Sequence, residues 1–337
     1  MNYRTGGPRS FNTVKRSNRE ERLKRRRQCD QTLVSMFVVF LLLVLSAFIL
    51  LVCNVAVGIH NRNQTAVQGE ESLPEAPNSP VSYVESDKVY YYRDGELVVV
   101  NKQHPYMING GLIALNDLVE LEADQSATYL VSNHKTQYLR EFVVDSLKAL
   151  LNEFYRQTGE TLTVKDTYRD KDQQAALGAQ AMPVGHSEYH TGLVLEFDTL
   201  SVAETAKLTS ICHQYGFIQR YPANNGDKTG VTYSYPECFR YVGVAHATYI
   251  YNYNKGKSDA EKLCWEEYVE KLQKDHSYEK DHLTVDTTGD NVADYEIYYV
   301  SINDVSGSAK IPVPVGMSYT VSGDNIGGVI VTVTLNS

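Results

Sequence analysis

Two separated stretches of this 337-residue chain carry side chains of the types that bind metals or act as nucleophiles. The first, PVGHSEYHTGLVLEFD, covers residues 183–198 and contains two histidines and the carboxylate of Glu196. The second, YSYPECFRYVG, covers residues 233–243 and contains Cys238. Imidazole, thiolate and carboxylate groups are the usual protein ligands of zinc, and a thiolate beside a histidine can also act as a nucleophile. These two stretches are therefore the candidates for a reactive site.

The other letters of both stretches resemble the VanY-type D-alanyl-D-alanine carboxypeptidases, zinc peptidases that trim the terminal D-Ala from peptidoglycan stem peptides. In that family the first stretch reads S-x-H-x-x-G-x-A-x-D, and its His and Asp bind zinc. The second reads E-P-W-H-x-R-Y-V-G, in which Glu is the general base and His the third ligand. The resemblance extends from about Leu97 to Leu272 and includes LVVVNKQHPY and DTYRDKDQQ. It implies an α+β domain whose central antiparallel sheet carries the site.

The zinc-ligand and base positions of the family hold other residues in this chain. Tyr189 and Cys238 stand where the family has its two histidines. Glu196 replaces the aspartate, and Tyr235 replaces the general base. A tyrosine, whose reference pKa is about 10, binds zinc only after losing its proton and cannot act as a carboxylate base. A Cys238 thiolate alone would be a tolerable ligand, but four substitutions together indicate a lost metal site, and we expect no cofactor.

Three positions that face the substrate in the family keep their residues here: Arg169, Gln174 and Ser187. The resemblance assigns Arg169 and Gln174 to substrate contacts, and a guanidinium group is suited to bidentate recognition of a carboxylate. The same residues could instead hold their loop to the core as scaffold. If they lie in a cleft, the chain can bind a peptide that ends in D-Ala without cutting it.

Two other arrangements would make the chain an enzyme. A local shift could bring His186 or His190 to a metal together with Glu196 and Cys238, which would give an active carboxypeptidase with an unorthodox zinc site. Neighbouring side chains of an extended segment point to opposite faces, which places His190 away from the site. Alternatively, Cys238 could act as a nucleophile with His246, eight residues further on, as its base.

Charge is distributed unevenly around one apolar stretch, LVSMFVVFLLLVLSAFILLVCNVAV. Residues 1–30 carry ten Lys or Arg and three acids, whereas residues 31–60 carry no Lys, Arg, Asp or Glu. The apolar run at 33–57 has 25 residues, more than the about 20 that cross a bilayer and too long for a signal-peptide core of about 7–15. The basic cluster at 24–27 keeps the N-terminus cytoplasmic. We therefore expect a single-pass signal anchor in the plasma membrane, with the C-terminal domain extracytoplasmic.

The sequence divides into five parts by composition. Residues 1–30 form the basic cytoplasmic head, which we interpret as a topology signal, not a nucleic-acid binding segment. The anchor occupies 31–60, and the polar, Pro- and Glu-containing stretch 61–87 is expected to be a flexible linker. A carboxypeptidase-like domain follows at 88–275. Residues 282–337 alternate short β-rich runs with turns and are few for an independent core, because about 60 residues are already marginal.

Periodicity predicts the main elements of the body. Apolar residues at helical spacing predict a helix over 136–158 that ends at Gly159, and further helices over 201–216 and 258–274. A short strand is expected at 161–165. The dipeptide Asp94-Gly95 between two β-rich runs predicts a hairpin over 88–102.

Cysteine usage gives no sign of two kinds of small scaffold. Three of the five cysteines follow the apolar stretch, namely Cys212, Cys238 and Cys264, and no C-x-x-C pair occurs. An odd number without paired spacing indicates neither a disulfide framework nor a zinc knuckle.

These observations favour a membrane-anchored, extracytoplasmic pseudo-peptidase of the VanY type that binds peptidoglycan stem peptides ending in D-Ala-D-Ala. Its partners would be the stem peptide and the membrane, and no nucleic acid. The first alternative is an active metallo-carboxypeptidase that releases terminal D-Ala with an unorthodox zinc site. The second is a structural or interaction module whose cleft is vestigial.

Overall fold

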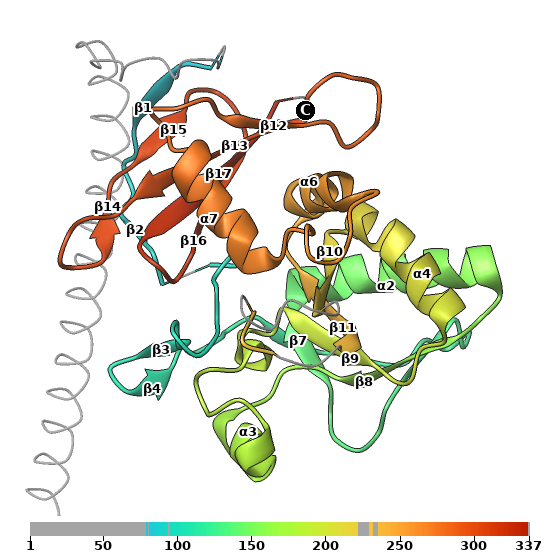
Figure 1. The fold of residues 1–337 in the computed structure, drawn as a ribbon. Coiled ribbons are helices and arrows are strands. Elements are labelled where there is room, and N and C mark those ends of the chain that lie inside the picture. The colour runs from blue at the N-terminus through green and yellow to red at the C-terminus, as the bar shows by residue number, and fades with distance from the viewer. Residues whose placement is uncertain (1–78, 80, 94, 222–228, 232–234, 336–337) are drawn as a thin grey trace, which may run out of the picture. The chain divides into compact units, whose positions relative to one another are not determined.

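The computed structural model describes most of the chain from residue 79 onwards, namely residues 79, 81–93, 95–221, 229–231 and 235–335 (Figure 1). The described residues all belong to one compact unit, residues 71–337, and residues 1–70 lie outside them. The expected membrane anchor at 33–57 and most of the expected linker also lie outside them. Within the described ranges, no helix is both long and apolar enough to cross a membrane.

A five-stranded sheet forms the centre of the described fold (Figure 1). Its strands, in spatial order, are β10 (Phe217–Tyr221), β11 (Tyr235–Tyr241), β9 (Val194–Phe197), β8 (Leu162–Asp166) and β6 (Tyr129–Val131). Neighbouring strands are antiparallel except for β6 and β8, which run parallel. The fold is thus mixed α and β with a largely antiparallel sheet, as expected.

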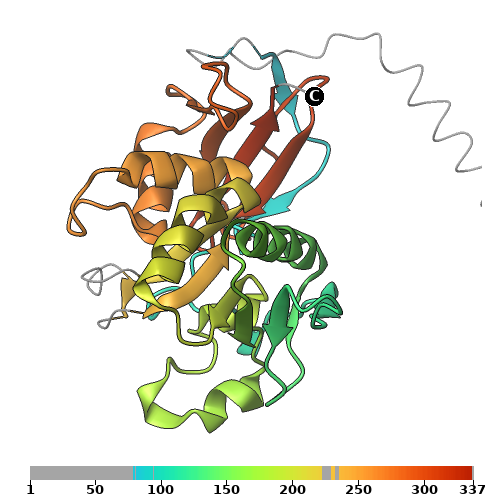
Figure 2. The same cartoon turned by 90° about the vertical axis from the view of Figure 1, so that its right-hand side faces the viewer.

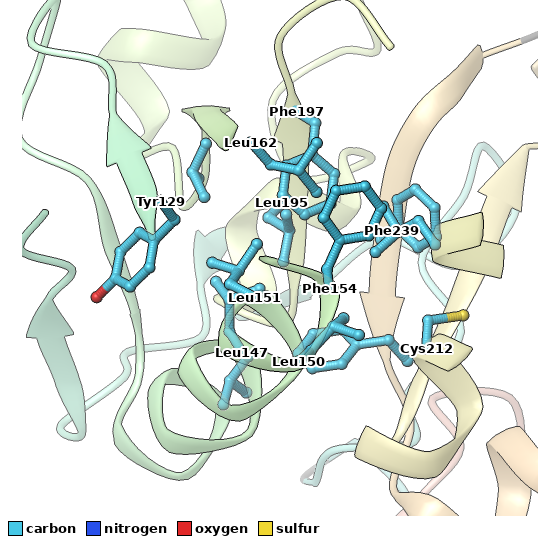
Figure 3. Close-up of a cluster of buried hydrophobic side chains, with 14 of the residues drawn as sticks. Tyr129, Leu147, Leu150, Leu151, Phe154, Leu162, Leu195, Phe197, Cys212 and Phe239 are labelled. Carbon is cyan, nitrogen blue, oxygen red and sulfur yellow. The ribbon is translucent and has the colours of Figure 1, made fainter. Parts of the chain in front are cut away.

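Helices α2 (Glu141–Thr158) and α4 (Val202–Ile211) cover one face of this sheet (Figure 2). The buried side chains of α2 recur every three or four residues, so they form one apolar face. Figure 3 shows this face packed against alternate residues of the strands, among them Leu195, Phe197 and Phe239. The helix begins at Glu141, five residues later than predicted, because residues 138–140 form a strand. It ends where predicted, at Gly159, whose φ of 74° lies in the left-handed region.

Shorter elements complete the central part of the fold. Two small strand pairs are β3 (Met107–Ile108) with β4 (Gly111–Leu112) and β5 (Leu118–Glu120) with β7 (Tyr138–Arg140). The remaining helices are α3 (Lys171–Ala176), η1 (Gly178–Gln180), η2 (Glu188–Thr191), η3 (Cys212–Tyr215), α6 (Val244–Asn254) and α7 (Trp265–Asp275). A capping box at Asp170 begins α3.

A second, four-stranded antiparallel sheet is built by the C-terminal part of the chain (Figure 1). Its order is β12 (Leu283–Val285), β13 (Tyr295–Ser301), β17 (Gly328–Thr334) and β16 (Tyr319–Gly323). Two strands from near residue 80–91 add to this part: β1 (Tyr83–Glu85) pairs with β15 (Pro312–Pro314), and β2 (Tyr90–Tyr91) pairs with β14 (Ser308–Ala309).

The two sheets share a buried apolar core. Ile218 of β10 and Trp265 of α7 belong to the same cluster as Ile297 and Ile330 of the C-terminal sheet. His246 of α6 also reaches across, because its Nε2 lies 2.9 Å from Oγ1 of Thr332. Residues 282–337 therefore complete the hydrophobic core of the central part of the fold.

Two further predicted elements differ in the structure. The hairpin over 88–102 is not formed. Strand β2 pairs with β14, and residues 97–100 are buried but belong to no strand. The amide of Val99 donates to the carbonyl of Asp324, so long-range pairing replaces the local turn. The third helix begins at Trp265, not at residue 258, because the Asn254 side chain binds the backbone of Leu263 and holds that segment in a turn.

Candidate functional site

Strands β9 and β11 bring Glu196 and Cys238 together. The two residues are direct partners in the antiparallel register. Side chains alternate between the faces of a sheet, so Leu195 and Phe239 enter the core while Glu196 and Cys238 point to the opposite face. Cys238 is completely buried there.

The short helix η2 places Tyr189 over this pair. It ends at Gly192, whose φ of 67° and close approach to Leu118 exclude a larger residue. The Tyr189 hydroxyl lies 3.2 Å from the Tyr235 hydroxyl and donates to the Cys238 sulfur over 3.8 Å. The Tyr235 side chain in turn hydrogen-bonds Glu196. The four substituted positions therefore form one hydrogen-bonded cluster, Tyr189–Tyr235–Glu196–Cys238, called the tyrosine cluster below.

Burial keeps three members of the tyrosine cluster protonated. It raises the pKa of Tyr189 well above the usual value, and the nearby Cys238 and Tyr235 add to this. Burial also raises the pKa of Tyr235, as does its hydrogen bond to Glu196. The pKa of Cys238 is raised mainly by burial and secondarily by Glu188. At neutral pH these groups are a neutral thiol and two neutral phenols.

Basic residues surround the carboxylate end of the cluster. Glu196 accepts a hydrogen bond of 2.6 Å from the Lys165 ammonium group. The Arg169 guanidinium lies 3.9 Å from the other Glu196 oxygen and 3.7 Å from the centre of the Tyr189 ring. Arg169 also donates twice to Asp166, over 2.9 and 2.7 Å. Lys165 and Asp166 were not identified as site residues from the sequence. They are the last two residues of β8 and lie just before Arg169 in the chain.

A cleft of about 280 Å³ opens beside the tyrosine cluster. The residues assigned to substrate contacts by the resemblance all line it, together with two tyrosines of the cluster: Arg169, Gln174, Ser187, Tyr189 and Tyr235. Gln174 is held by a 2.7 Å hydrogen bond from its Nε2 to the Met182 carbonyl. Its buried Oε1 has no hydrogen-bond partner among the described residues. The structure thus brings the predicted substrate-side set to one cavity.

The three histidines considered as metal ligands or bases have other contacts. Nδ1 of His186 lies 2.9 Å from the Asn101 carbonyl, and Nδ1 of His190 lies 2.7 Å from the Arg169 carbonyl. His246 contacts the Tyr268 hydroxyl through Nδ1 at 2.7 Å. In the part of the chain that the structure describes, no three His, Cys, Asp or Glu side chains are grouped so as to hold a metal ion.

A buried charge network behind η2 was not found from the sequence. Glu188 accepts from Nε of Arg220 over 2.6 Å and from the Tyr221 hydroxyl over 2.9 Å. Arg240 donates to the second oxygen of Glu188, and Arg220 reaches Glu266 over 2.5 Å. Burial alone would raise the pKa of Glu188, but the charges of Arg220 and Arg240 outweigh it and hold that pKa below its usual value. Arginines at apolar strand positions, as in FIQRY, are the signal that indicates such a network.

Comparisons with known proteins bear on the same region. The family model for VanY, D-alanyl-D-alanine carboxypeptidase, matches residues 136–244. A D-alanyl-D-alanine carboxypeptidase of Enterococcus faecium is 28% identical over 293 residues, which cover 82% of this chain and 86% of that protein. One from Enterococcus faecalis is 26% identical over 192 residues, which cover 52% and 66%.

The fold is also found in a solved structure. The vancomycin-resistance D,D-dipeptidase VanXYg, in complex with a D-Ala-D-Ala phosphinate analog, aligns with a TM-score of 0.57 at 22% identity. The alignment covers 73% of this chain and 98% of VanXYg. At this identity the likeness establishes the fold.

Removing the Glu188 charge is expected to destabilise the protein strongly. Glu188→Gln leaves two buried arginines without their shared partner, and breaking such a pair costs about 3–5 kcal/mol. The difference in the free energy of unfolding between the variant and the unmodified protein is measured by urea unfolding at pH 7 and at lower pH. It should become smaller as the pH falls. A carboxylate with a depressed pKa stabilises the fold above its unfolded pKa and loses this contribution as it is protonated.

Glu153→Gln is the matched control, because Glu153 pairs with the exposed Arg156 on the surface of α2 and should change stability little. Equal effects of the two substitutions would show that the buried network does not hold η2.

Proposed function

The chain contains a VanY-family D-alanyl-D-alanine carboxypeptidase domain at residues 136–244, and we propose that this domain binds stem peptides ending in D-Ala-D-Ala without cleaving them. The tyrosine cluster is the observation that carries the proposal. It occupies the ligand and base positions of the family, while the residues of the substrate side still line the adjacent cleft.

The donor set of the tyrosine cluster does not fit a catalytic zinc ion. Such an ion needs three protein ligands and an open position for water. Tyr189 and Cys238 would each have to lose a proton that burial holds firmly. The Glu196 carboxylate is already engaged by Lys165 and Tyr235. Tyr235 supplies a phenol where the reaction needs a carboxylate to accept the proton of water.

The charges around the cleft suit a peptide carboxylate. Lys135 lies 2.6 Å from Asp166, and together with Lys165 and Arg169 it gives three cations near the carboxylates of Asp166 and Glu196. This set has one positive charge in excess. Nη1 of Arg169 makes no hydrogen bond within the described residues, so it is available as a donor. The curated relatives are named for D-Ala-D-Ala substrates, which supports this ligand class.

The unmodified protein is expected to release no D-Ala from a pentapeptide stem, with or without added zinc. The reason is that Tyr235, at the base position, keeps its proton, and the one carboxylate of the cluster, Glu196, is paired with Lys165. Released D-Ala can be measured with a coupled amino-acid oxidase assay. The control is the variant with Tyr189→His, Glu196→Asp, Tyr235→Glu and Cys238→His, which restores the family's residues. Zinc-dependent release by the unmodified protein, abolished by a chelator, would establish an active carboxypeptidase instead.

A stem peptide ending in D-Ala-D-Ala is expected to bind more tightly than the same peptide with an amidated C-terminus. A hydrogen bond to a charged group contributes about 1.5–3 kcal/mol, or roughly 10-fold to 150-fold in affinity. Arg169→Ala should remove the preference, as measured by calorimetry. The variant should remain folded, because Lys135 still pairs with Asp166.

Arg156→Ala is the matched control, since Arg156 lies on the exposed surface of α2 and pairs only with Glu153 among its salt-bridge partners in the described chain. It should leave the preference for the free acid intact. If the unmodified protein binds the free-acid peptide and the amidated peptide equally well, Arg169 only holds its loop to the core. That result would favour a structural module with a vestigial cleft.

We further propose that residues 33–57 anchor the domain in the plasma membrane, with the domain extracytoplasmic. The basic cluster at 24–27 and the 25-residue apolar run support this topology. Protease added to intact cells should degrade a C-terminally tagged chain and leave a small protected N-terminal fragment. A chain released into the medium by cleavage near residue 60 would contradict the proposal.

A further inference from the structure

A second groove lies away from the tyrosine cluster and its cleft. It has a volume of about 650 Å³ and is bounded by β2, by the turn at residues 304–307 that precedes β14, and by the β3–β4 hairpin. It shares no lining residue with the cleft. Figure 1 shows β2 and β14 on the same side of the molecule as the β3–β4 hairpin.

Exposed apolar side chains gather at this groove. Tyr91 is 56% exposed, Ile108 is 45% exposed and Val305 is fully exposed, and all three line it. Val89, 47% exposed, lies two residues before Tyr91 on the same segment. These four are among only eleven exposed large apolar residues in the described ranges. An exposed apolar patch with polar groups around it marks a binding site.

One aromatic wall of the groove is held rigidly. The Tyr92 ring packs against Gly307, where an added Cβ would lie 2.6 Å from the ring. The Arg93 guanidinium lies 5.1 Å from the centre of the Tyr92 ring, and its Nε donates to the Tyr92 hydroxyl over 2.9 Å. Tyr91, which pairs with Ser308 in the strand register, is free of such packing and presents its ring to solvent.

Polar groups of three kinds line the same groove. Asp304 accepts the Ser306 amide through Oδ1 over 2.7 Å. Its hydrogen bonds from Ser306 lower its pKa, so the carboxylate is ionised at neutral pH. Asn109 lies at the tip of the β3–β4 hairpin with a φ of 51° and lines the groove. A carboxylate, an amide and a guanidinium together offer both acceptors and donors.

We propose that this groove binds pyranose rings of a cell-wall glycan. A pyranose has apolar C–H faces that stack on aromatic rings and a rim of neutral hydroxyls that both donate and accept hydrogen bonds. Tyr91 and Tyr92 supply the aromatic surfaces, and Asp304 and Asn109 supply the polar partners. The Asp304 carboxylate and the Arg93 guanidinium leave the groove without net charge, which suits a neutral ligand. A purely apolar partner would take both charges out of water without replacing their hydrogen bonds.

The groove is linked to the peptide cleft by one short segment. The Tyr106 amide donates to the Gly185 carbonyl over 2.7 Å, and the Met107 side chain packs on Gly185. Gly185 lies beside His186 and Ser187 of the cleft, whereas Ile108 begins the groove. A glycan here fits the proposed function, because stem peptides are attached to glycan strands, but the sugar site depends only on its own residues.

The test is binding of chitohexaose to the purified full-length protein, measured by calorimetry. Tyr91→Ala should weaken binding about tenfold or more, because the stacking surface is lost. Asp304→Asn should also weaken it, while the amide oxygen can still accept from Ser306. Tyr155→Ala, at another exposed tyrosine, on α2, is the control and should bind as the unmodified protein does.

Cellohexaose, which lacks acetamido groups, distinguishes the source of the sugar. Weaker binding of cellohexaose than of chitohexaose supports an N-acetylated wall glycan. No binding of chitohexaose, or equal binding by Tyr91→Ala and the unmodified protein, overturns the proposal. Stem-peptide affinity measured on the same variants should not change, so failure of the peptide site and failure of the sugar site are separable.

Discussion

The Glu188 carboxylate, buried between Arg220 and Arg240, is the interaction on which the candidate site depends. Two charges taken out of water are stable only when their partners are close and well oriented. Here Glu188 belongs to η2, the arginines belong to β10 and β11, and Glu266 belongs to α7. The network therefore holds the turn with Ser187 and Tyr189 against the central sheet. It also joins this turn to α7, which packs on the C-terminal sheet.

With that turn fixed, the identities of four residues decide what the site can do. The sequence resemblance implies that these positions hold zinc ligands and a base in the VanY family. Here two phenols, a thiol and a carboxylate satisfy one another by hydrogen bonds. Neutral groups are less costly to bury than charged ones, and the one carboxylate, Glu196, is paired with Lys165. The cleft beside the tyrosine cluster keeps Arg169, Gln174 and Ser187 in its lining, which supports the proposed peptide-binding role.

Sequence reasoning located the candidate site because the motif letters and their order are local. It placed Tyr189, Glu196, Tyr235 and Cys238 in one site, and it predicted α2 and its end at Gly159, since both follow from periodicity and a glycine stop. It missed Glu188 and Lys165, whose partners are distant in sequence. The hairpin at Asp94-Gly95 was wrong because β2 finds a partner more than 200 residues away. Likewise, no periodicity reveals that the C-terminal sheet completes the core around Trp265.

Zinc binding by the purified protein tests the central claim most directly. Calorimetric titration after chelator treatment should detect no zinc bound at the tyrosine cluster, and Cys238→Ser should leave the titration unchanged. The variant that restores the family's residues at the four positions is the positive control for detecting a zinc site in this fold. About one zinc per chain in the unmodified protein, lost in Cys238→Ser, would show that the tyrosine cluster is a metal site and would contradict the account.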